Sequence, residues 1–163
     1  MKNKRMLALS VLGPASLAVV AAGCGGSPSA VAGAGYAPPK TGPAVSVAHT
    51  TLGPMLVDAH GRSLYLFEQD KGTTSSCSGA CASVWPPAAA PAKLVAGRGI
   101  SQAKLGLTQR KDGRTQVTYA GHPLYSYAGD AKPGDARGQG VDQFGAEWYV
   151  LAPSGRKIDK DAT

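Results

Sequence analysis

The sequence predicts a small all-β, antiparallel domain made of two similar β-hairpin repeats, preceded by a cleaved signal peptide and a disordered tether. Three observations predict this fold. From Val45 onward, short runs of β-forming residues alternate with Gly, Pro and Asp. No window long enough for a helix has apolar residues at i, i+3, i+4 and i+7. The chain also matches itself at an offset of 60 residues.

Length and charge narrow the function classes. The chain has 163 residues, and removal of a leader leaves room for one modest domain, which excludes a TIM barrel, a two-domain dehydrogenase or a kinase. Three of the 17 basic residues lie within residues 1–5, and no acidic residue precedes Cys24. The mature chain therefore carries 14 basic against 10 acidic residues, spread along the sequence. This charge pattern does not predict nucleic-acid binding.

Residues 1–23 have the pattern of a secretory signal peptide. A basic start, Met1 to Arg5, precedes a short apolar stretch that Gly13 and Pro14 interrupt, which suits a membrane span poorly. The stretch ends in Ala21-Ala22-Gly23-Cys24, which resembles a bacterial lipobox. We therefore expect acylation of the Cys24 thiol. Ordinary secretion, with Cys24 as a spare thiol, is the alternative.

Residues 24–44 are predicted to be a flexible tether. The segment GGSPSAVAGAGYAPPKTGP has almost no large side chains, so it cannot bury enough apolar surface to offset the cost of ordering its backbone. Two or more acyl chains on Cys24 would anchor the protein stably. The expected location is therefore the outer face of the bacterial cell membrane, with the membrane as a partner through the lipid on Cys24.

The domain that follows, residues 45–160, reads as strands joined by turns. Val45, Val47 and His49 alternate with small or polar residues, as in a half-buried strand. Further strand and turn pairs are expected along the chain: 55–57 and 64–67 around the turn 58–61, 105–108 and 115–119 around 111–113, 124–127 after 120–123, and a last core strand at 148–151.

An internal duplication divides this domain into a first repeat, 45–104, and a second repeat, 105–160. At an offset of 60, six residues of the first repeat match identical residues of the second without a gap: Gly53, Val57, Gly61, Leu64, Tyr65 and Asp70 fall on Gly113, Val117, Gly121, Leu124, Tyr125 and Asp130. One hairpin with a tail cannot bury its apolar face alone. We therefore expect the repeats to pack together about a pseudo-two-fold axis.

These residues resemble the bacterial lipoproteins of the "secreted repeat of unknown function" family. That family carries a Tyr-x-(Phe/Trp/Tyr)-x-x-Asp motif, usually twice. Here the copies run from Tyr65 through Phe67 to Asp70 and from Tyr125 through Tyr127 to Asp130. The stretch Cys77-Ser78-Gly79-Ala80-Cys81-Ala82-Ser83-Val84-Trp85-Pro86-Pro87 and the closing Trp148-Tyr149-Val150 also look like the family pattern. The resemblance implies an envelope lipoprotein and supplies no catalytic residue.

The motif itself allows two interpretations. Positions i and i+2 of a strand share a face, so Tyr65 with Phe67, and Tyr125 with Tyr127, form same-face aromatic pairs. In the first interpretation these pairs belong to the core, and the aspartates close a turn by accepting backbone N–H bonds. In the second, the carboxylates and rings bind a cation, a sugar or an aromatic ligand. The spacing gives no sign of the paired carboxyls of a glycosidase, so we expect no catalytic residue.

Cys77 and Cys81 are predicted to form a disulfide, because two close thiols of an exported protein usually pair. Their spacing suits one turn of helix. A redox role is the alternative, although the Cys-x-x-Cys motif of thiol oxidoreductases is absent. His49, His60 and His122 are isolated along the sequence, which predicts no metal and no cofactor. A site could form only if facing repeats brought His60 and His122 together.

Together these features predict a membrane-anchored module of the cell envelope that binds or supports other molecules and is not an enzyme. Its small-molecule or envelope partner is not identified by the sequence. The alternative, from a different class, is an extracytoplasmic redox, electron-transfer or metal-binding accessory that uses Cys77 and Cys81 or the turn histidines.

Overall fold

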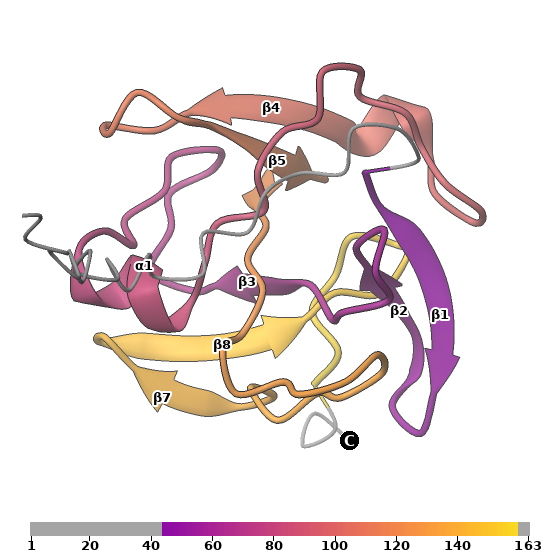
Figure 1. The fold of residues 1–163 in the computed structure, drawn as a ribbon. Helices are drawn as coiled ribbons and strands as arrows, with labels where there is room; N and C mark the ends of the chain where they lie inside the picture. Colours follow the sequence, from indigo (N-terminus) through magenta and orange to yellow (C-terminus); the bar gives the residue numbers. More distant parts are fainter. Residues whose placement is uncertain (1–43, 160–163) are drawn as a thin grey trace, which may run out of the picture. The chain divides into compact units, whose positions relative to one another are not determined.

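The computed structural model describes residues 44–159 (Figure 1). The predicted signal peptide, Cys24 and the tether up to residue 43 lie outside these residues. No helix between residues 44 and 159 combines the length and the apolar character needed to cross a bilayer.

The prediction of a small antiparallel β-domain is confirmed. Strands β1 and β2 form one sheet, strands β3, β8 and β7 a second in that order, and strands β4, β5 and β6 a third, with every pairing antiparallel (Figure 1). The strands are β1 (Ser46–Thr50), β2 (Gly53–Val57), β3 (Tyr65–Phe67), β4 (Leu105–Gln109), β5 (Thr115–Tyr119), β6 (His122–Pro123), β7 (Val141–Gln143) and β8 (Ala146–Val150), and the helical segments are α1 (Ala80–Val84) and the 3₁₀ turn η1 (Gln102–Lys104).

The predicted pairing of residues 55–57 with residues 64–67 around the turn 58–61 is only partly correct. Residues 55–57 and 64–67 do approach each other, through the bridge Val57–Ser63 and a 3.0 Å bond from the Leu64 N–H to the Leu56 carbonyl. Strand β3 then leaves β2 and pairs with β8 instead. The reason lies in burial, because all three residues of β3 are buried. Buried backbone N–H and C=O groups need hydrogen-bond partners, so both edges of β3 must be paired, and a lone hairpin would pair only one of them.

The predicted strand at 124–127 is also wrong as a regular strand. Only His122 and Pro123 form β6, and the residues that follow bond to the segment around Pro86 and Pro87. The Ser126 N–H donates to the Pro86 carbonyl at 2.9 Å. Because proline has no N–H, residues 86 and 87 cannot complete a ladder. An isolated bridge between Pro87 and Tyr125 results.

The two repeats are interleaved. Strand β3 of the first repeat pairs with β8 of the second, and residues 84–88 of the first repeat bond residues 124–128 of the second. Two equivalent bonds mark the relation: the Leu56 N–H donates to the Leu151 carbonyl, and the Val117 N–H donates to the Ala88 carbonyl, each at 2.9 Å. Each repeat therefore depends on the last segment of the other to complete its own hydrogen bonds.

The core consists of two clusters. One is mainly aliphatic and contains Leu56, Leu66, Leu124 and Leu151 among its fully or nearly buried residues. The other is aromatic and includes the first tyrosine of each motif copy, both tryptophans and the two cysteines predicted to form a disulfide: Tyr65, Tyr125, Trp85, Trp148, Cys77 and Cys81. The motif therefore lies inside the domain.

Candidate functional site

The two motif tyrosines meet at the junction of the repeats. The Tyr65 N–H donates to the Tyr125 carbonyl at 2.8 Å, and the Tyr125 N–H donates to the Tyr65 carbonyl at 3.0 Å. Both side chains are fully buried. Their hydroxyls cross between repeats: Tyr65 donates to Asp130 and Tyr125 donates to Asp70, each at 2.8 Å. The tyrosine of each motif copy thus donates to the aspartate of the other copy.

Asp130 is held on both oxygens. Its Oδ2 accepts the Tyr65 hydroxyl, and its Oδ1 accepts the Arg137 N–H at 2.9 Å. The Gly138 N–H donates to the Tyr65 oxygen at 3.3 Å. Burial raises the pKa of the Asp130 carboxyl above its usual value, and burial followed by the nearby Asp130 charge holds the pKa of Tyr65 far above 10.

Asp70 has an equivalent but more exposed environment. Its Oδ2 accepts the Tyr125 hydroxyl, and its Oδ1 accepts both the N–H and the hydroxyl of Ser76 at 2.8 Å. The Tyr125 hydroxyl also lies 2.7 Å from the Ser75 oxygen. Burial and then the Asp70 charge raise the pKa of Tyr125 well above its usual range. Both aspartates accept a backbone N–H from the loop that follows, and the tyrosine bonds across repeats are additional to the expected ones.

Four aromatic rings stack in a column through this junction. Phe67 lies on Trp148 with ring centroids 4.0 Å apart, Trp148 lies on Trp85 at 4.0 Å, and Trp85 lies on Tyr127 at 4.3 Å. Tyr65 meets the Trp85 ring edge-on. Each motif aromatic therefore stacks on the tryptophan of the other repeat. Sequence reasoning missed the equivalence of the tryptophans because the segment between Tyr125 and Trp148 is three residues longer than that between Tyr65 and Trp85.

Two glycines make space for the column. A Cβ at Gly138 would lie 2.5 Å from Cη2 of Trp85, and one at Gly129 would overlap the Tyr127 ring. Three glycines of the 134–145 stretch, Gly134, Gly140 and Gly145, have positive φ, a backbone conformation that glycine adopts readily. Close approach of a ring explains Gly138 instead.

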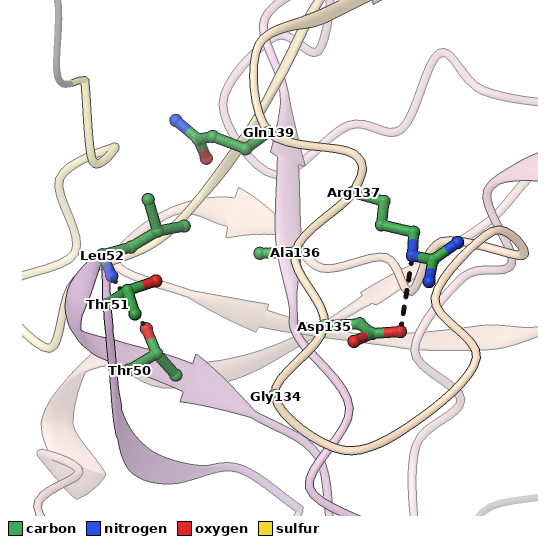
Figure 2. Close-up of a pocket in the computed structure, with 8 residues that line it drawn as sticks. All are labelled: Thr50, Thr51, Leu52, Gly134, Asp135, Ala136, Arg137 and Gln139. Carbon is green, nitrogen blue, oxygen red and sulfur yellow. Dashed lines mark hydrogen bonds and ion pairs between the residues drawn. The ribbon is translucent and has the colours of Figure 1, made fainter.

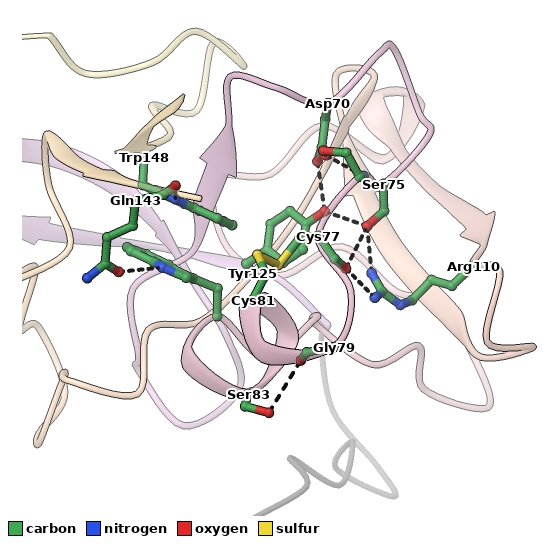
Figure 3. The surroundings of a disulfide bond; sticks show 12 residues. Asp70, Ser75, Cys77, Gly79, Cys81, Ser83, Arg110, Tyr125, Gln143 and Trp148 are labelled. Carbon is green, nitrogen blue, oxygen red and sulfur yellow. Dashed lines mark hydrogen bonds between the residues drawn. A yellow bond between two sulfur atoms is a disulfide. The ribbon is translucent and has the colours of Figure 1, made fainter. Parts of the chain in front are cut away.

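Cys77 and Cys81 are joined by a disulfide, as predicted, with Cα atoms 5.3 Å apart (Figure 3). Only Cys81 lies in α1, so the expected full helical turn is wrong: the segment from Cys77 to Gly79 precedes the helix. Both cysteines are buried, at 1% and 6% exposure, in the aromatic cluster with Tyr125 and Trp148. This burial limits access of an exchanging thiol to the bridge.

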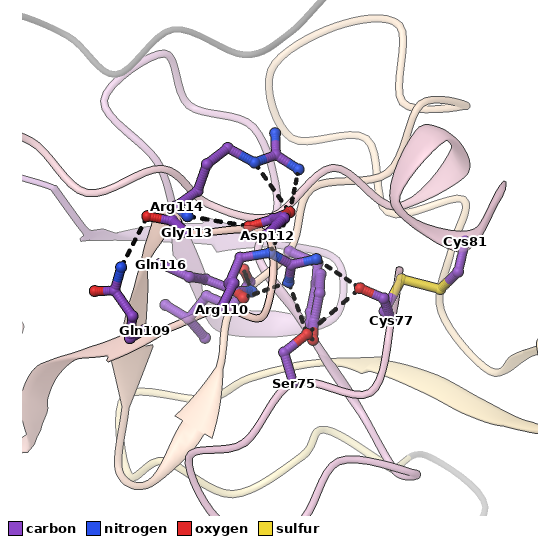
Figure 4. A network of polar contacts seen from close by, with 11 residues as sticks. Ser75, Cys77, Cys81, Gln109, Arg110, Asp112, Gly113, Arg114 and Gln116 are labelled. Carbon is purple, nitrogen blue, oxygen red and sulfur yellow. Dashed lines mark hydrogen bonds and ion pairs between the residues drawn. A yellow bond between two sulfur atoms is a disulfide. The ribbon is translucent and has the colours of Figure 1, made fainter. Parts of the chain in front are cut away.

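Arg110 is a buried cation that the sequence did not reveal. Its guanidinium donates to the Ser75 oxygen and the Gln116 amide oxygen at 2.7 Å and to the Cys77 carbonyl at 2.6 Å (Figure 4). Its Nε lies 3.3 Å from Asp112. Arg110 thus fastens the cysteine loop to β5 and continues the chain of contacts through Ser75 to Tyr125. In the sequence, Arg110 lies between the predicted strand 105–108 and the predicted turn 111–113, and nothing there indicates burial.

Two hollows in the described part of the chain involve none of the motif residues. The larger, about 330 Å³, lies between the β1–β2 turn, residues 50–52, and the loop of residues 134–139 (Figure 2). Its wall carries Arg137, whose Nε lies 3.5 Å from Asp135. The smaller, about 70 Å³, lies beside Ser75, Cys77 and Arg110.

The histidines lie apart from this junction. His49 is exposed on β1, His60 lies in the turn after β2 with its Nδ1 4.0 Å from Asp58, and His122 opens β6. Among residues 44–159, no group of three or more His, Cys, Asp or Glu side chains is arranged to hold a metal ion.

The comparisons decide the family. The family model "Secreted repeat of unknown function" matches the chain twice, at residues 46–89 and 106–152, which together make up more than half of it. The chain belongs to this family of secreted repeats. No curated protein and no solved structure gives a significant match. The family description is that of an extracytoplasmic module, in agreement with the predicted location outside the cytoplasm.

For a secreted repeat of this family, the geometry explains why the motif occurs twice. Tyr65 needs an aspartate that the second copy supplies, and Tyr125 needs one that the first copy supplies. The motif therefore works as a reciprocal pair, and a single copy would leave both a hydroxyl and a carboxylate without their partners.

Proposed function

We propose that the chain is a lipid-anchored module on the outer face of the cell membrane, that it is not an enzyme, and that it acts through binding or structural contacts in the envelope. The cross-repeat use of the motif is the observation that carries the proposal. The groups best suited to chemistry, Tyr65, Tyr125, Asp70 and Asp130, all have partners within the domain. Their hydroxyls and carboxylates hold the fold together.

The electrostatics support a structural role for the two tyrosines. General acid–base catalysis favours a pKa near the working pH. Burial raises the pKa of Tyr65 and of Tyr125, which moves both values further away from a neutral working pH. Neither hydroxyl is then a ready base, and neither lines one of the two hollows described above. Contacts with partners therefore fall to the surface of the domain.

Acylation of Cys24 is the part of the proposal that the lipobox-like Ala21-Ala22-Gly23-Cys24 supports. Native mass spectrometry of protein extracted gently from its own membranes tests it directly. We expect a mass that includes acyl chains on Cys24 and the two-hydrogen loss of the Cys77–Cys81 bridge. A retained small molecule would name the ligand class, and an unmodified Cys24 would remove the anchor.

The need for the anchor is tested by Cys24→Ser in the organism that makes the protein. We expect the variant to be released and the envelope phenotype of a deletion strain to remain uncorrected, while wild-type protein corrects it. Release without any loss of function would contradict the anchored module.

Reduction of the disulfide distinguishes this proposal from the alternative, in which the chain is a redox accessory that uses Cys77 and Cys81. Since both cysteines are buried, we expect the bridge to resist mild reductant, and Cys77→Ala to lower stability without removing a specific activity. A bridge that cycles at the potentials of exchange proteins would support the redox alternative.

A further inference from the structure

We propose that strand β4 is a self-association edge, at which a second copy of the chain pairs antiparallel through its own β4. The strand is the outer member of the sheet β4-β5-β6, at the top of Figure 1. An outer strand presents N–H and C=O groups on one side, and these groups form a template for another strand.

The pairing between β4 and β5 determines which groups face outward. The Ala120 N–H donates to the Lys104 carbonyl, and the Arg110 N–H donates to the Arg114 carbonyl. Both bonds fall in the register in which Leu107 lies opposite Val117. Hydrogen-bonded positions alternate along an antiparallel pair. Residues 104, 106, 108 and 110 therefore bond toward β5, and residues 105, 107 and 109 point their backbone groups away from it.

Most of these outward groups are available. The Leu105 N–H is used, because it donates to the Gln102 carbonyl at the end of η1. Within residues 44–159, the Leu105 carbonyl and both backbone groups of Leu107 and Gln109 have no partner apart from solvent. The strand Leu-Gly-Leu-Thr-Gln contains no charged residue and no proline, the two usual guards of an exposed edge.

One register uses these groups best. A two-fold axis through Leu107 lets its N–H donate to the Leu107 carbonyl of the second copy, and the reverse. In the same register the Gln109 N–H of each copy donates to the Leu105 carbonyl of the other. The Leu105 N–H is already bonded within its own chain. In this register, therefore, only the Gln109 carbonyl of each copy stays without a partner strand group, and it faces solvent. The exposed Leu107 side chain, at 49%, then lies against its own copy.

We infer that the partner at this edge is a second copy of the chain, because the outward N–H and C=O groups of residues 105, 107 and 109 pair with the same groups of another β4. A five-residue edge buries less than the roughly 1,000 Å² of a stable interface, so pairing in free solution is weak. Confinement to a membrane raises the effective concentration of the two edges. This last step rests on the proposed lipid anchor, whereas the pairing geometry does not.

The test has a solution arm and a membrane arm. In solution, sedimentation of the full chain carrying Cys24→Ser is followed from the micromolar to the millimolar range. Leu107→Pro removes an N–H that β5 does not use, so it should spare the fold and abolish association. Leu107→Lys, which places like charges opposite each other, is the second variant. Val95→Lys, at another exposed apolar side chain, is the matched control.

In the membrane arm, the acylated chain is placed in vesicles of phosphatidylethanolamine and phosphatidylglycerol and oxidised mildly. Paired residues at a hydrogen-bonded position lie about 5.5 Å apart between Cα atoms, within disulfide reach. Leu107→Cys should therefore cross-link between copies. Gln109→Cys should not, because Gln109 lies opposite Leu105 of the second copy and far from the Gln109 of that copy.

Concentration-dependent dimers that Leu107→Pro and Leu107→Lys abolish and Val95→Lys preserves support the edge. A chain that stays monomeric to millimolar concentration, or dimers that neither Leu107 variant weakens, overturn it. If mass spectrometry finds no acyl group on Cys24, the anchor fails and the solution arm still decides the edge.

Discussion

The exchange of partners between the two motif copies can be measured as a coupling free energy. Tyr65→Phe removes the hydroxyl that donates to Asp130 at 2.8 Å and that accepts the longer 3.3 Å bond from Gly138. A hydrogen bond to a charged group contributes about 1.5–3 kcal/mol, and the weaker bond adds at most about 1 kcal/mol. We therefore expect Tyr65→Phe to lower the free energy of unfolding by about 1.5–4 kcal/mol.

The decisive quantity comes from two double-mutant cycles. Tyr65→Phe combined with Asp130→Asn should show a coupling of about 1–2 kcal/mol, because Asp130→Asn leaves at most a neutral hydrogen bond where the wild type has a bond to a charged carboxylate. Tyr65→Phe combined with Asp70→Asn should be additive within about 0.5 kcal/mol, since no hydrogen bond in the described residues joins Tyr65 to Asp70. Urea unfolding, followed by the fluorescence of the buried tryptophans, gives each value. Coupling within a motif copy, or none across copies, would refute the exchange.

The pH dependence of the same variants supplies an independent reading. The pKa of Asp130 is raised in the folded state above its usual 3.8, so the folded protein holds the proton more tightly. The contribution of Asp130 to stability is therefore complete below about pH 3.8 and is lost as the pH rises through the raised value. Asp130→Asn should remove this decline. An identical pH profile for the variant and the wild type would argue against a buried carboxyl.

Three further predictions concern pH and backbone space. Because the pKa values of Tyr65 and Tyr125 are raised above 10, stability should fall as the pH rises beyond 10, and Tyr65→Phe should reduce that fall in thermal melts. Gly138→Ala places a Cβ 2.5 Å from Trp85, so we expect a loss of about 1–3 kcal/mol and a weaker near-ultraviolet circular dichroism signal; an unchanged signal would contradict the packing. Phe144 has φ 61 in a two-residue turn, so Phe144→Asn should stabilise the chain by about 1 kcal/mol in urea unfolding. A less stable variant would instead assign the ring a packing role.

The sequence predicted the fold class well because it depends on local patterns. Alternation, turn residues and the offset of 60 located β1, β2, β3, β4, β5 and β8, although β3 pairs with another strand than expected. Strand β7 was missed because its turn carries Phe144 where Gly or Asn is usual, so the hairpin signal is absent. The regular strand at 124–127 failed because its neighbour contains Pro86 and Pro87.

The site was predicted only in part, for a different reason. Strand periodicity states which residues share a face within a repeat, and on that basis Tyr65 and Phe67 were paired correctly with the core. Periodicity cannot state which repeat supplies the partner of a hydroxyl. The bond from Tyr65 to Asp130 and the stacking of Phe67 on Trp148 both depend on interleaving, which arises only in three dimensions.

Interleaving also governs the order in which the protein can mature. Synthesis delivers the chain from its N-terminus, yet the neighbour of β3 is β8, which ends at Val150. Until that residue has been delivered, β3 has no β8 to pair with, and Phe67 has no Trp148 ring to stack on. The first repeat therefore cannot complete its sheet or its aromatic column before the second repeat has followed. A chain that stops short of Trp148 exposes two unfinished repeats, and such exposed strands favour aggregation or degradation.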